Sequence, residues 1–354
     1  MAELTEGQKL TNRYIEIMKD SHACRFICED GYLFDDSSAP GRGEYERMFT
    51  LSDVRKRSLQ VQILRYLAWT TYADMQMILR LARMFAATQE IPNVVTDEAH
   101  ITALMTSLMK MGCVVCRTYR SPDGQKGKGT LRCYTLTDRG AELFKDQTDY
   151  DEFIETNLVG KGELDVMKRL ASNYIMTKYA PMIMASGCEP VYCQNVLSKD
   201  GEGIRKVLYG CIKGEKSYTV FEPAFYMRNA SVAREQELVR RIEKRQKFLI
   251  QNLESAGDGK QKILVLVVEN SSWLKRAYAD YGETISKCDA VYVTTESLAN
   301  AWTGEGPSPF LLVAVDRDKM KKTNTRSGGG GELFLKLEAS ERTDPPFVCR
   351  TKKK

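Results

Sequence analysis

Residues 112–140 read GCVVCRTYRSPDGQKGKGTLRCYTLTDRG, and this stretch decides the fold that we expect for the first half of the chain. Val114, Cys116 and Thr118 alternate with their neighbours as residues on one face of a β-strand do, and Thr130 to Thr137 is a second β-prone run. The segment between the two runs is rich in glycine and favours a turn. The stretch therefore predicts a β-hairpin with a glycine-rich tip.

Three stretches before the hairpin carry apolar side chains at the three- and four-residue spacing of amphipathic helices. They are Arg57 to Ala68, Ala73 to Ala87, and the stretch that follows Thr96 and ends at Gly112. Thr96 is the N-cap that we expect for the third helix, and the β-prone piece Trp69 to Tyr72 separates the first two.

A further helix is expected to begin directly after the hairpin, around Thr137 to Phe144. Three helices, a hairpin and a closing helix is the order of a winged helix-turn-helix domain, which we place at residues 52–146. The phrase YTLTDRG, residues 134–140, resembles the strand-to-helix junction common in bacterial winged-helix regulators.

Basic residues gather on and around the predicted hairpin. Between residues 110 and 133 a single acid, Asp123, stands against Lys110, Arg117, Arg120, Lys126, Lys128 and Arg132. Such side chains on a protruding hairpin suit contacts with phosphates. The third helix carries Thr102, Thr106, Ser107 and Lys110 opposite its apolar stripe, where they can approach a major groove. We therefore predict that these residues bind double-stranded DNA; the alternative is a winged helix used only as a protein-interaction scaffold.

The second half of the chain predicts an α/β domain with a mixed sheet, so the whole chain belongs to the α+β class. Residues 147–163 are acidic and then glycine-bearing, as in a linker, and the α/β domain covers residues 164–318. The expected order is a helix at Leu164–Ala180, strands at Pro190–Leu197, Arg205–Ile212 and Ser217–Phe221, a long helix at Val232–Glu254, a strand at Ile263–Val268, a helix at Ser272–Ser286, and strands at Ala290–Thr294 and Pro309–Val315.

Three segments of this order carry a resemblance: Tyr218 to Glu222, the long helix Arg234 to Asn252, and Ile263 to Glu269. Joined to the upstream winged helix, the pattern over residues 55–315 is similar to the replication-relaxation family of plasmid and conjugative-element proteins. The resemblance implies DNA binding in plasmid replication, mobilisation or its regulation. It also implies a C-terminal core similar to restriction-endonuclease folds.

A nuclease of that fold needs one acid on a strand and an acid-x-Lys triplet on the next, so that two carboxylates hold magnesium. Glu222 stands where the second acid falls, but Pro223 and Ala224 follow it and no lysine does. The one acid-x-Lys triplet of the chain, Asp258 to Lys260, lies in an expected turn. We therefore predict no catalytic residue and an inactive core, with a metal-dependent nuclease as the alternative.

Other site chemistry has little material in this sequence. His22, Cys24 and Cys28 match no common zinc spacing, and the pair Cys113 and Cys116, with Cys133 nearby, lacks the second close pair of a structural zinc site. The chain contains only two histidines, and it has no phosphate-binding loop of the GxxxxGK[ST] type. We therefore predict no metal, no cofactor and no enzyme activity.

The formal charge of +5 is a weak pointer to nucleic acid, because Arg350 and Lys352 to Lys354 lie together at the end of the chain. Ten scattered cysteines are typical of reduced thiols, and no apolar run approaches the ~20 residues of a membrane span, so we expect a cytoplasmic protein. Residues 1–51 are expected to form a helix (Leu10 to Lys19) and an irregular segment, and residues 319–354 a flexible basic tail with a short strand in Glu332 to Glu338. The α/β domain would bind a protein partner or a second copy.

Overall fold

In the computed structural model the chain divides into two compact units. The helix–hairpin unit comprises Cys28–Pro181 and Val191–Tyr209, and the sheet unit comprises Met1–Ile27, Met182–Pro190 and Gly210–Lys354. The boundary thus differs from the one drawn at residues 147–163, because most of the helix after it belongs with the first half of the chain. The structure describes residues 26, 33–36, 54–88, 96–120, 131–156, 162–197, 203–226, 231–257, 259–305, 308–314, 336–338 and 345–347.

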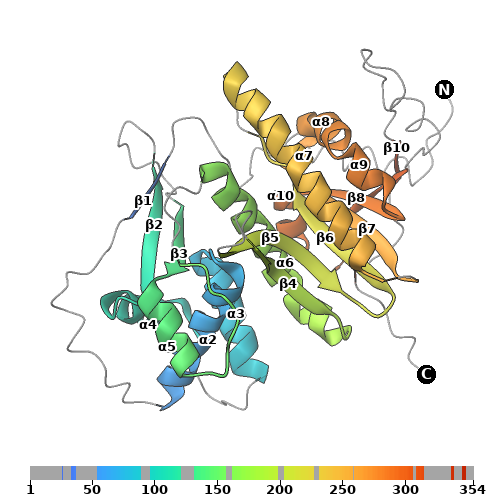
Figure 1. Ribbon diagram of the computed structural model, residues 1–354. Coiled ribbons are helices and arrows are strands. Elements are labelled where there is room, and N and C mark those ends of the chain that lie inside the picture. Colours follow the sequence, from blue (N-terminus) through green and yellow to red (C-terminus); the bar gives the residue numbers. More distant parts are fainter. Residues whose placement is uncertain are drawn as a thin grey trace, which may run out of the picture. The chain divides into compact units, whose positions relative to one another are not determined.

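Helices and a hairpin form the first part of the helix–hairpin unit, in the order that the sequence predicts (Figure 1). They are α2 (Val54–Thr70), α3 (Met75–Thr88), α4 (Glu98–Lys110), β2 (Val114–Arg120), β3 (Arg132–Leu136) and α5 (Asp138–Asp146). Strand β1 (Leu33–Asp36) pairs with β2, giving a three-stranded sheet in the order β1-β2-β3. The hairpin tip, residues 121–130, and the expected helix Leu10 to Lys19 lie outside the described residues.

The segment between α2 and α3 forms a single β-bridge and not the β-strand that the β-prone piece Trp69 to Tyr72 predicts. Helix α2 continues to Thr70, and Thr71 then takes a positive φ of 64°, which ends the helix. Ala73 alone pairs with the hairpin: its N–H donates to the carbonyl of Tyr134 at 3.1 Å and its carbonyl accepts from the N–H of Tyr134 at 2.8 Å. This bridge fixes the turn between α2 and α3 to the free edge of β3.

Side-chain caps define where α4 and α5 begin. Asp97, rather than the expected Thr96, is the N-cap of α4, because its carboxylate accepts from the N–H of His100 at 2.7 Å and suits the positive end of the helix dipole. The hydroxyl of Thr137 accepts from the N–H of Gly140 at 3.1 Å and donates to the carbonyl of Gly112 at 2.6 Å. A Cβ on Gly140 would lie 2.0 Å from the carbonyl oxygen of Cys113, so this position requires glycine.

Helix α6 (Glu163–Ala185) is buried on nearly every side, which removes the clear amphipathic pattern of a surface helix. It runs five residues beyond the expected end at Ala180 and contains the exposed Pro181. Among the helices that the structure describes, none is both long and apolar enough to cross a membrane.

The larger sheet is mixed and has the strand order β10-β9-β8-β7-β6-β5-β4. Strand β6 is antiparallel to β5 and parallel to β7, β7 is parallel to β8, and β9 is antiparallel to both β8 and β10. Its strands are β4 (Glu189–Leu197), β5 (Ile204–Lys213), β6 (Ser217–Pro223), β7 (Gln261–Val268), β8 (Ala290–Thr295), β9 (Leu311–Ala314) and β10 (Lys336–Glu338). The chain is thus of mixed helix and sheet, as expected for the α+β class.

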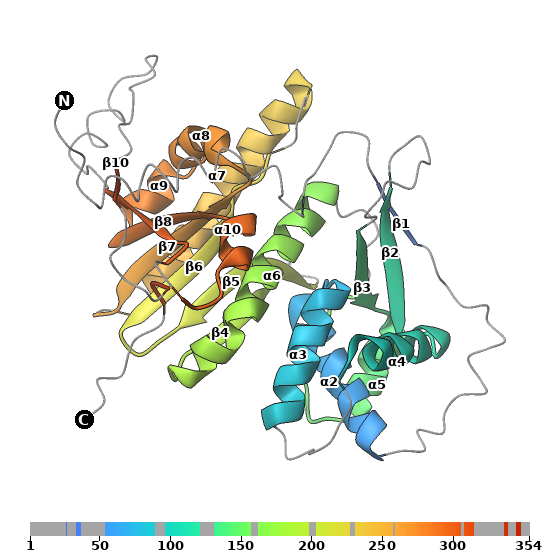
Figure 2. The same ribbon diagram turned by 180° about the vertical axis from the view of Figure 1, so that it is seen from behind.

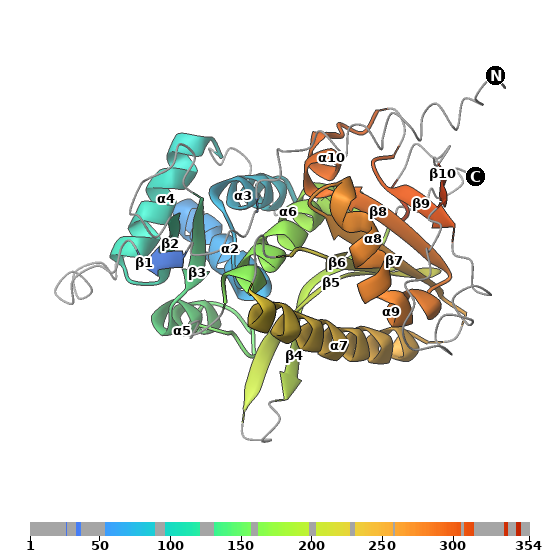
Figure 3. The same ribbon diagram turned by 90° about the horizontal axis from the view of Figure 1, so that it is seen from above.

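Helices cover both faces of the sheet unit. Viewed from above, α7 (Val232–Ser255) lies on one side of strands β6 to β8 and α10 (Glu296–Ala301) on the other (Figure 3). Helices α8 (Leu274–Asp280) and α9 (Gly282–Ser286) lie beside α7. Residues 263–268 of β7 are at most 2% exposed, which confirms a strand that is buried on both faces. Phe221, Phe310 and the fully buried Phe347 pack together, with ring centroids 5.4 to 6.2 Å apart.

Candidate nucleic-acid interface

Helix α4 presents a face of small side chains to solvent. Ile101, Leu104, Met105 and Leu108 are buried on the opposite face. The exposed residues are Glu98, Ala99, Thr102, Ala103, Thr106 and Lys110, and Ser107 is half-buried. The hydroxyl of Thr106 donates to the carbonyl of Thr102 at 2.9 Å, one turn earlier. Because the exposed side chains between Ala99 and Thr106 are short, a partner can approach this middle part of the helix backbone closely.

The hairpin separates two of the expected basic contacts. Thr118 pairs with Arg132 and Arg117 pairs with Cys133, and directly paired residues share a face, so Arg117 and Arg132 lie on opposite faces of the sheet. Arg132 is exposed, whereas Arg117 is half-buried on the face that also carries the buried Cys133. Arg132 is therefore better placed than Arg117 to reach a partner.

Three of the expected contacts cannot be placed as side chains. Arg120 ends strand β2, and its side chain lies outside the described part of the structure. Lys126 and Lys128 belong to the hairpin tip, which lies outside it altogether. The exposed contacts that the structure supplies are therefore Thr102, Thr106 and Lys110 on α4 and Arg132 on β3.

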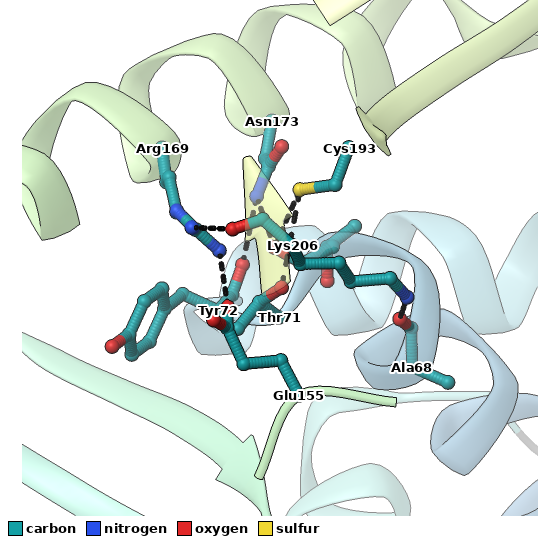
Figure 4. Close-up of polar contacts among 9 residues, drawn as sticks. Ala68, Thr71, Tyr72, Glu155, Arg169, Asn173, Cys193 and Lys206 are labelled. Atoms are coloured by element: carbon teal, nitrogen blue, oxygen red, sulfur yellow. Dashed lines mark hydrogen bonds and ion pairs between the residues drawn. The ribbon is translucent and has the colours of Figure 1, made fainter. Parts of the chain in front are cut away.

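A buried polar cluster holds the end of α2 in place (Figure 4). Asn173 on α6 donates its amide hydrogens to the carbonyls of Thr70 at 2.9 Å and Tyr72 at 3.0 Å. The amine of Lys206 on β5 donates to the carbonyl of Ala68. The last carbonyls of a helix have no partner within the helix and carry its negative dipole end, so an amide and an amine are suitable caps.

Arg169 connects this cluster to the segment after α5. Its guanidinium donates to the carbonyl of Lys206 at 2.6 Å and to the Glu155 carboxylate at 3.1 Å, with side-chain exposures of 5% for Arg169 and 8% for Glu155. Glu155 falls in the expected linker, residues 147–163, where Ile154 is also buried. Burial lowers the pKa of the Lys206 amine below its usual value. The turn that carries the Ala73 bridge is thus held by side chains of α6 and β5.

Sequence reasoning did not single out Arg169, Asn173 or Lys206. The available signal was the spacing of Arg169 and Asn173, which lie four residues apart in a run that is otherwise mostly apolar. Polar residues at such positions need partners when the helix is buried on all sides. The partners of Asn173 are the backbone carbonyls of Thr70 and Tyr72, roughly a hundred residues away in sequence, which no local pattern identifies.

Glu222, the acid considered for a nuclease site, is buried and bound to two neighbours in the sheet unit. Its side chain is 1% exposed, and Oε2 accepts from Nε and Nη2 of Arg245 on α7 at 2.9 and 2.7 Å. Oε1 accepts from the hydroxyl of Tyr281 at 2.7 Å. Glu222 is thus a buried carboxylate that is held by one basic side chain and one tyrosine hydroxyl.

The cysteines of the hairpin do not converge on one point. Cys116 pairs with Tyr134 and Cys133 with Arg117, so Cys116 and Cys133 lie on opposite faces of the sheet. All three are buried, and burial raises the pKa of the Cys113 thiol to about 11, which opposes the thiolate form that a metal needs. In the described ranges no group of three or more His, Cys, Asp or Glu could hold a metal ion. His22, Cys24 and Cys28 lie outside those ranges.

Comparison of the chain with protein-family models, with curated proteins and with solved structures gave no match.

Proposed function

We propose that the chain is a DNA-binding protein that reads duplex DNA with α4 and contacts phosphates from the hairpin β2–β3. The observation that carries the proposal is the element order α2, α3, α4, β2, β3 together with the bridge of Ala73 to Tyr134. In a winged helix the segment between the first two helices pairs with the second hairpin strand, and the single bridge of Ala73 makes this pairing here. Figure 2 shows α4 next to the hairpin.

The exposed face of α4 suits entry into a major groove. Its threonines carry hydroxyls that can donate to or accept from base edges, and its short side chains allow close approach. Lys110 ends the helix and can reach a phosphate or a guanine. Glu98 in the first turn would be repelled by phosphates, so this end of the helix favours base edges over the DNA backbone. At a base edge its carboxylate can accept a hydrogen bond from cytosine N4.

Charge supports the same partner. Residues 52–146 contain fourteen Lys and Arg against nine Asp and Glu, so an excess equal to the formal charge of the whole chain falls in this part. Neutralised phosphates release counterions, and this release favours binding at low salt. A role in plasmid or mobile-element replication, mobilisation or transcription control is the biological setting that the family resemblance suggests for such binding.

We assign no catalytic role to the sheet unit. Glu222 already accepts three hydrogen bonds from Arg245 and Tyr281, which leaves little capacity for magnesium. A unit without chemistry can still bury its sheet and offer its outer helix to a partner.

Binding to a labelled duplex, measured by fluorescence anisotropy over a salt series, tests the proposal. Replacing both Lys110 and Arg132 by glutamine is expected to weaken binding at all sequences and to reduce the log–log salt slope by about 1.8, because each phosphate contact contributes about 0.9. The matched control replaces the exposed Lys145 on α5 and the exposed Arg205 on β5 by glutamine, and it is expected to keep the wild-type slope. A Lys110/Arg132 variant that keeps the wild-type slope contradicts the proposed contact surface.

A second variant separates reading from phosphate contact. Thr106→Glu places a carboxylate in the middle of the exposed face of α4, and it is expected to abolish preference for the natural site selected from genomic DNA. Ala103→Ser, on the same face, is the control for mild change. Site preference that survives Thr106→Glu shows that α4 is not the reading helix.

A further inference from the structure

Helix α7 has a buried stripe and, opposite it, a ridge of basic side chains. The buried stripe consists of Leu238, Ile242, Gln246, Leu249 and Leu253. Arg240, Lys244 and Lys247 are exposed and follow one another at spacings of four and three residues, which places them on one line along the helix. With a rise of about 1.5 Å per residue, the line is about 10 Å long.

Three of the four acids of α7 are paired with residues outside this ridge. The fourth, Glu243, is exposed and lies three residues after Arg240 and four before Lys247, so the ridge carries three positive charges beside one negative charge and stays positive. Glu237 pairs with Arg241 at 3.1 Å, Glu235 with Arg276, and Glu254 with Lys287 at 3.3 Å. The hydrogen bond from Arg241 lowers the pKa of Glu237, with smaller contributions from the charges of Arg241, Lys244 and Arg240.

Within the described part of the chain, none of the three ridge residues forms an ion pair of its own. Like charges three or four residues apart on a helix repel each other and destabilise it. Such an arrangement becomes favourable when a polyanion neutralises it.

We propose that Arg240, Lys244 and Lys247 form a phosphate-contact ridge that binds the backbone of nucleic acid. A line of about 10 Å faces about three phosphates on one strand, since each strand of a duplex carries one charge per ~3.4 Å of axis. A strand backbone therefore matches both the sign and the density of the ridge. The choice of nucleic acid as partner rests on the proposed function, but the contact surface is on a different unit from α4 and the hairpin.

Three variants and the wild-type chain test the ridge. The ridge variant replaces Arg240, Lys244 and Lys247 by glutamine, which keeps a high helix propensity. The charge-matched control replaces the exposed Lys213 and Lys216 of the same unit and the exposed Arg205 of β5 by glutamine. The third is the Lys110/Arg132 variant described above. Circular dichroism and urea unfolding first establish that each variant is folded, and anisotropy with a 30-base-pair duplex then gives the affinity from 50 to 200 mM salt.

The ridge variant is expected to have a salt slope lower by about 2.7, so that the rise in salt weakens its binding about 40-fold less than that of the wild type. The charge-matched control is expected to keep the wild-type slope within about 0.5. A wild-type slope in the ridge variant, or an equal loss in the control, overturns the ridge.

The Lys110/Arg132 variant distinguishes failure of the ridge from failure of the proposed function. If that variant binds like wild type while the ridge variant loses slope, the ridge stands and the contact surface proposed for α4 and the hairpin falls. If the ridge variant alone is unchanged, the ridge falls and the proposed function stands. A wild-type chain that binds no duplex overturns both.

Discussion

Replacing Glu222 by alanine removes the carboxylate to which Arg245 donates from Nε and Nη2. The change deletes two charge-assisted hydrogen bonds, at 2.9 and 2.7 Å, and the bond from Tyr281 at 2.7 Å. Breaking a buried ion pair by removing one partner costs about 3–5 kcal/mol. The Arg245 side chain is 15% exposed and can regain some water, so we expect the lower end, about 3 kcal/mol.

Urea unfolding followed by circular dichroism measures this cost, and a double-mutant cycle assigns it. Glu222→Ala, Arg245→Met and the double variant are expected to show a coupling of about 1–3 kcal/mol, because the loss of one partner already removes the interaction. Tyr281→Phe deletes one hydrogen bond and is expected to cost about 1 kcal/mol. Burial raises the pKa of Tyr281, so its hydroxyl remains a donor across the whole pH range of the assay.

The same variant distinguishes a structural Glu222 from a metal-binding one. A carboxylate that serves magnesium would be removed at little cost to folding, and supercoiled plasmid would be nicked by wild type but not by Glu222→Ala. A loss below about 1 kcal/mol together with such nicking refutes our reasoning and supports the nuclease alternative. A large loss of stability, with no nicking by the wild type in magnesium or manganese, agrees with it.

Three further substitutions test other parts of the fold, each by urea unfolding. Gly140→Ala is expected to cost about 3 kcal/mol, because its Cβ would lie 2.0 Å from the Cys113 carbonyl, whereas Gly203→Ala, with nothing within 4 Å, should be near neutral. Glu155→Gln leaves Arg169 charged and buried, and is expected to cost about 3 kcal/mol while the exposed Asp151→Asn changes little. Burial lowers the pKa of Lys178 from its ordinary value of 10.5 to about 8. The charged amine therefore disfavours the folded state below pH 8, and wild-type stability should rise as the pH increases from 8 towards 10.5. Lys178→Met should therefore be more stable at pH 7, by about 1 kcal/mol after allowance for partial exposure, and should lack this rise; an unchanged pH profile would contradict the cause.

Local patterns predicted the elements whose environment is local. The three-four spacing located α2, α3 and α4. Helix α4 buries one stripe and exposes the opposite one, whereas no residue from Leu59 to Thr70 of α2 is exposed. The alternation at Val114, Cys116 and Thr118 predicted β2, and the unbroken apolar run at Ile263 to Val268 predicted β7. Gly140 could be recognised as part of a junction phrase, but its reason, the approach of Cys113, appears only in three dimensions.

Long-range partners could not be predicted from the sequence. Helix α6 is buried on almost all sides, so its sequence does not divide into an apolar and a polar face. Asn173 of this helix and Lys206 of β5 donate to backbone carbonyls at the end of α2, which are distant in sequence. The alternation of β2 and β3 predicted a hairpin, but only the register shows that Arg117 and Arg132 lie on opposite faces. A count of basic residues along the chain therefore overstates how many can meet one duplex.

The contacts of the polar cluster bear on how the proposed reading helix is held. Asn173 binds the carbonyls on both sides of Thr71, and Ala73, two residues on, bridges to β3. The same strand leads into Thr137, whose hydroxyl binds Gly112 at the end of α4. Three sets of hydrogen bonds, joined by short stretches of backbone, thus connect α6 through the α2–α3 turn and β3 to the end of α4. Because each link is buried or half-buried, a shift of α6 would require the others to break or move with it, and the orientation of α4 depends on residues outside the stretch 52–146.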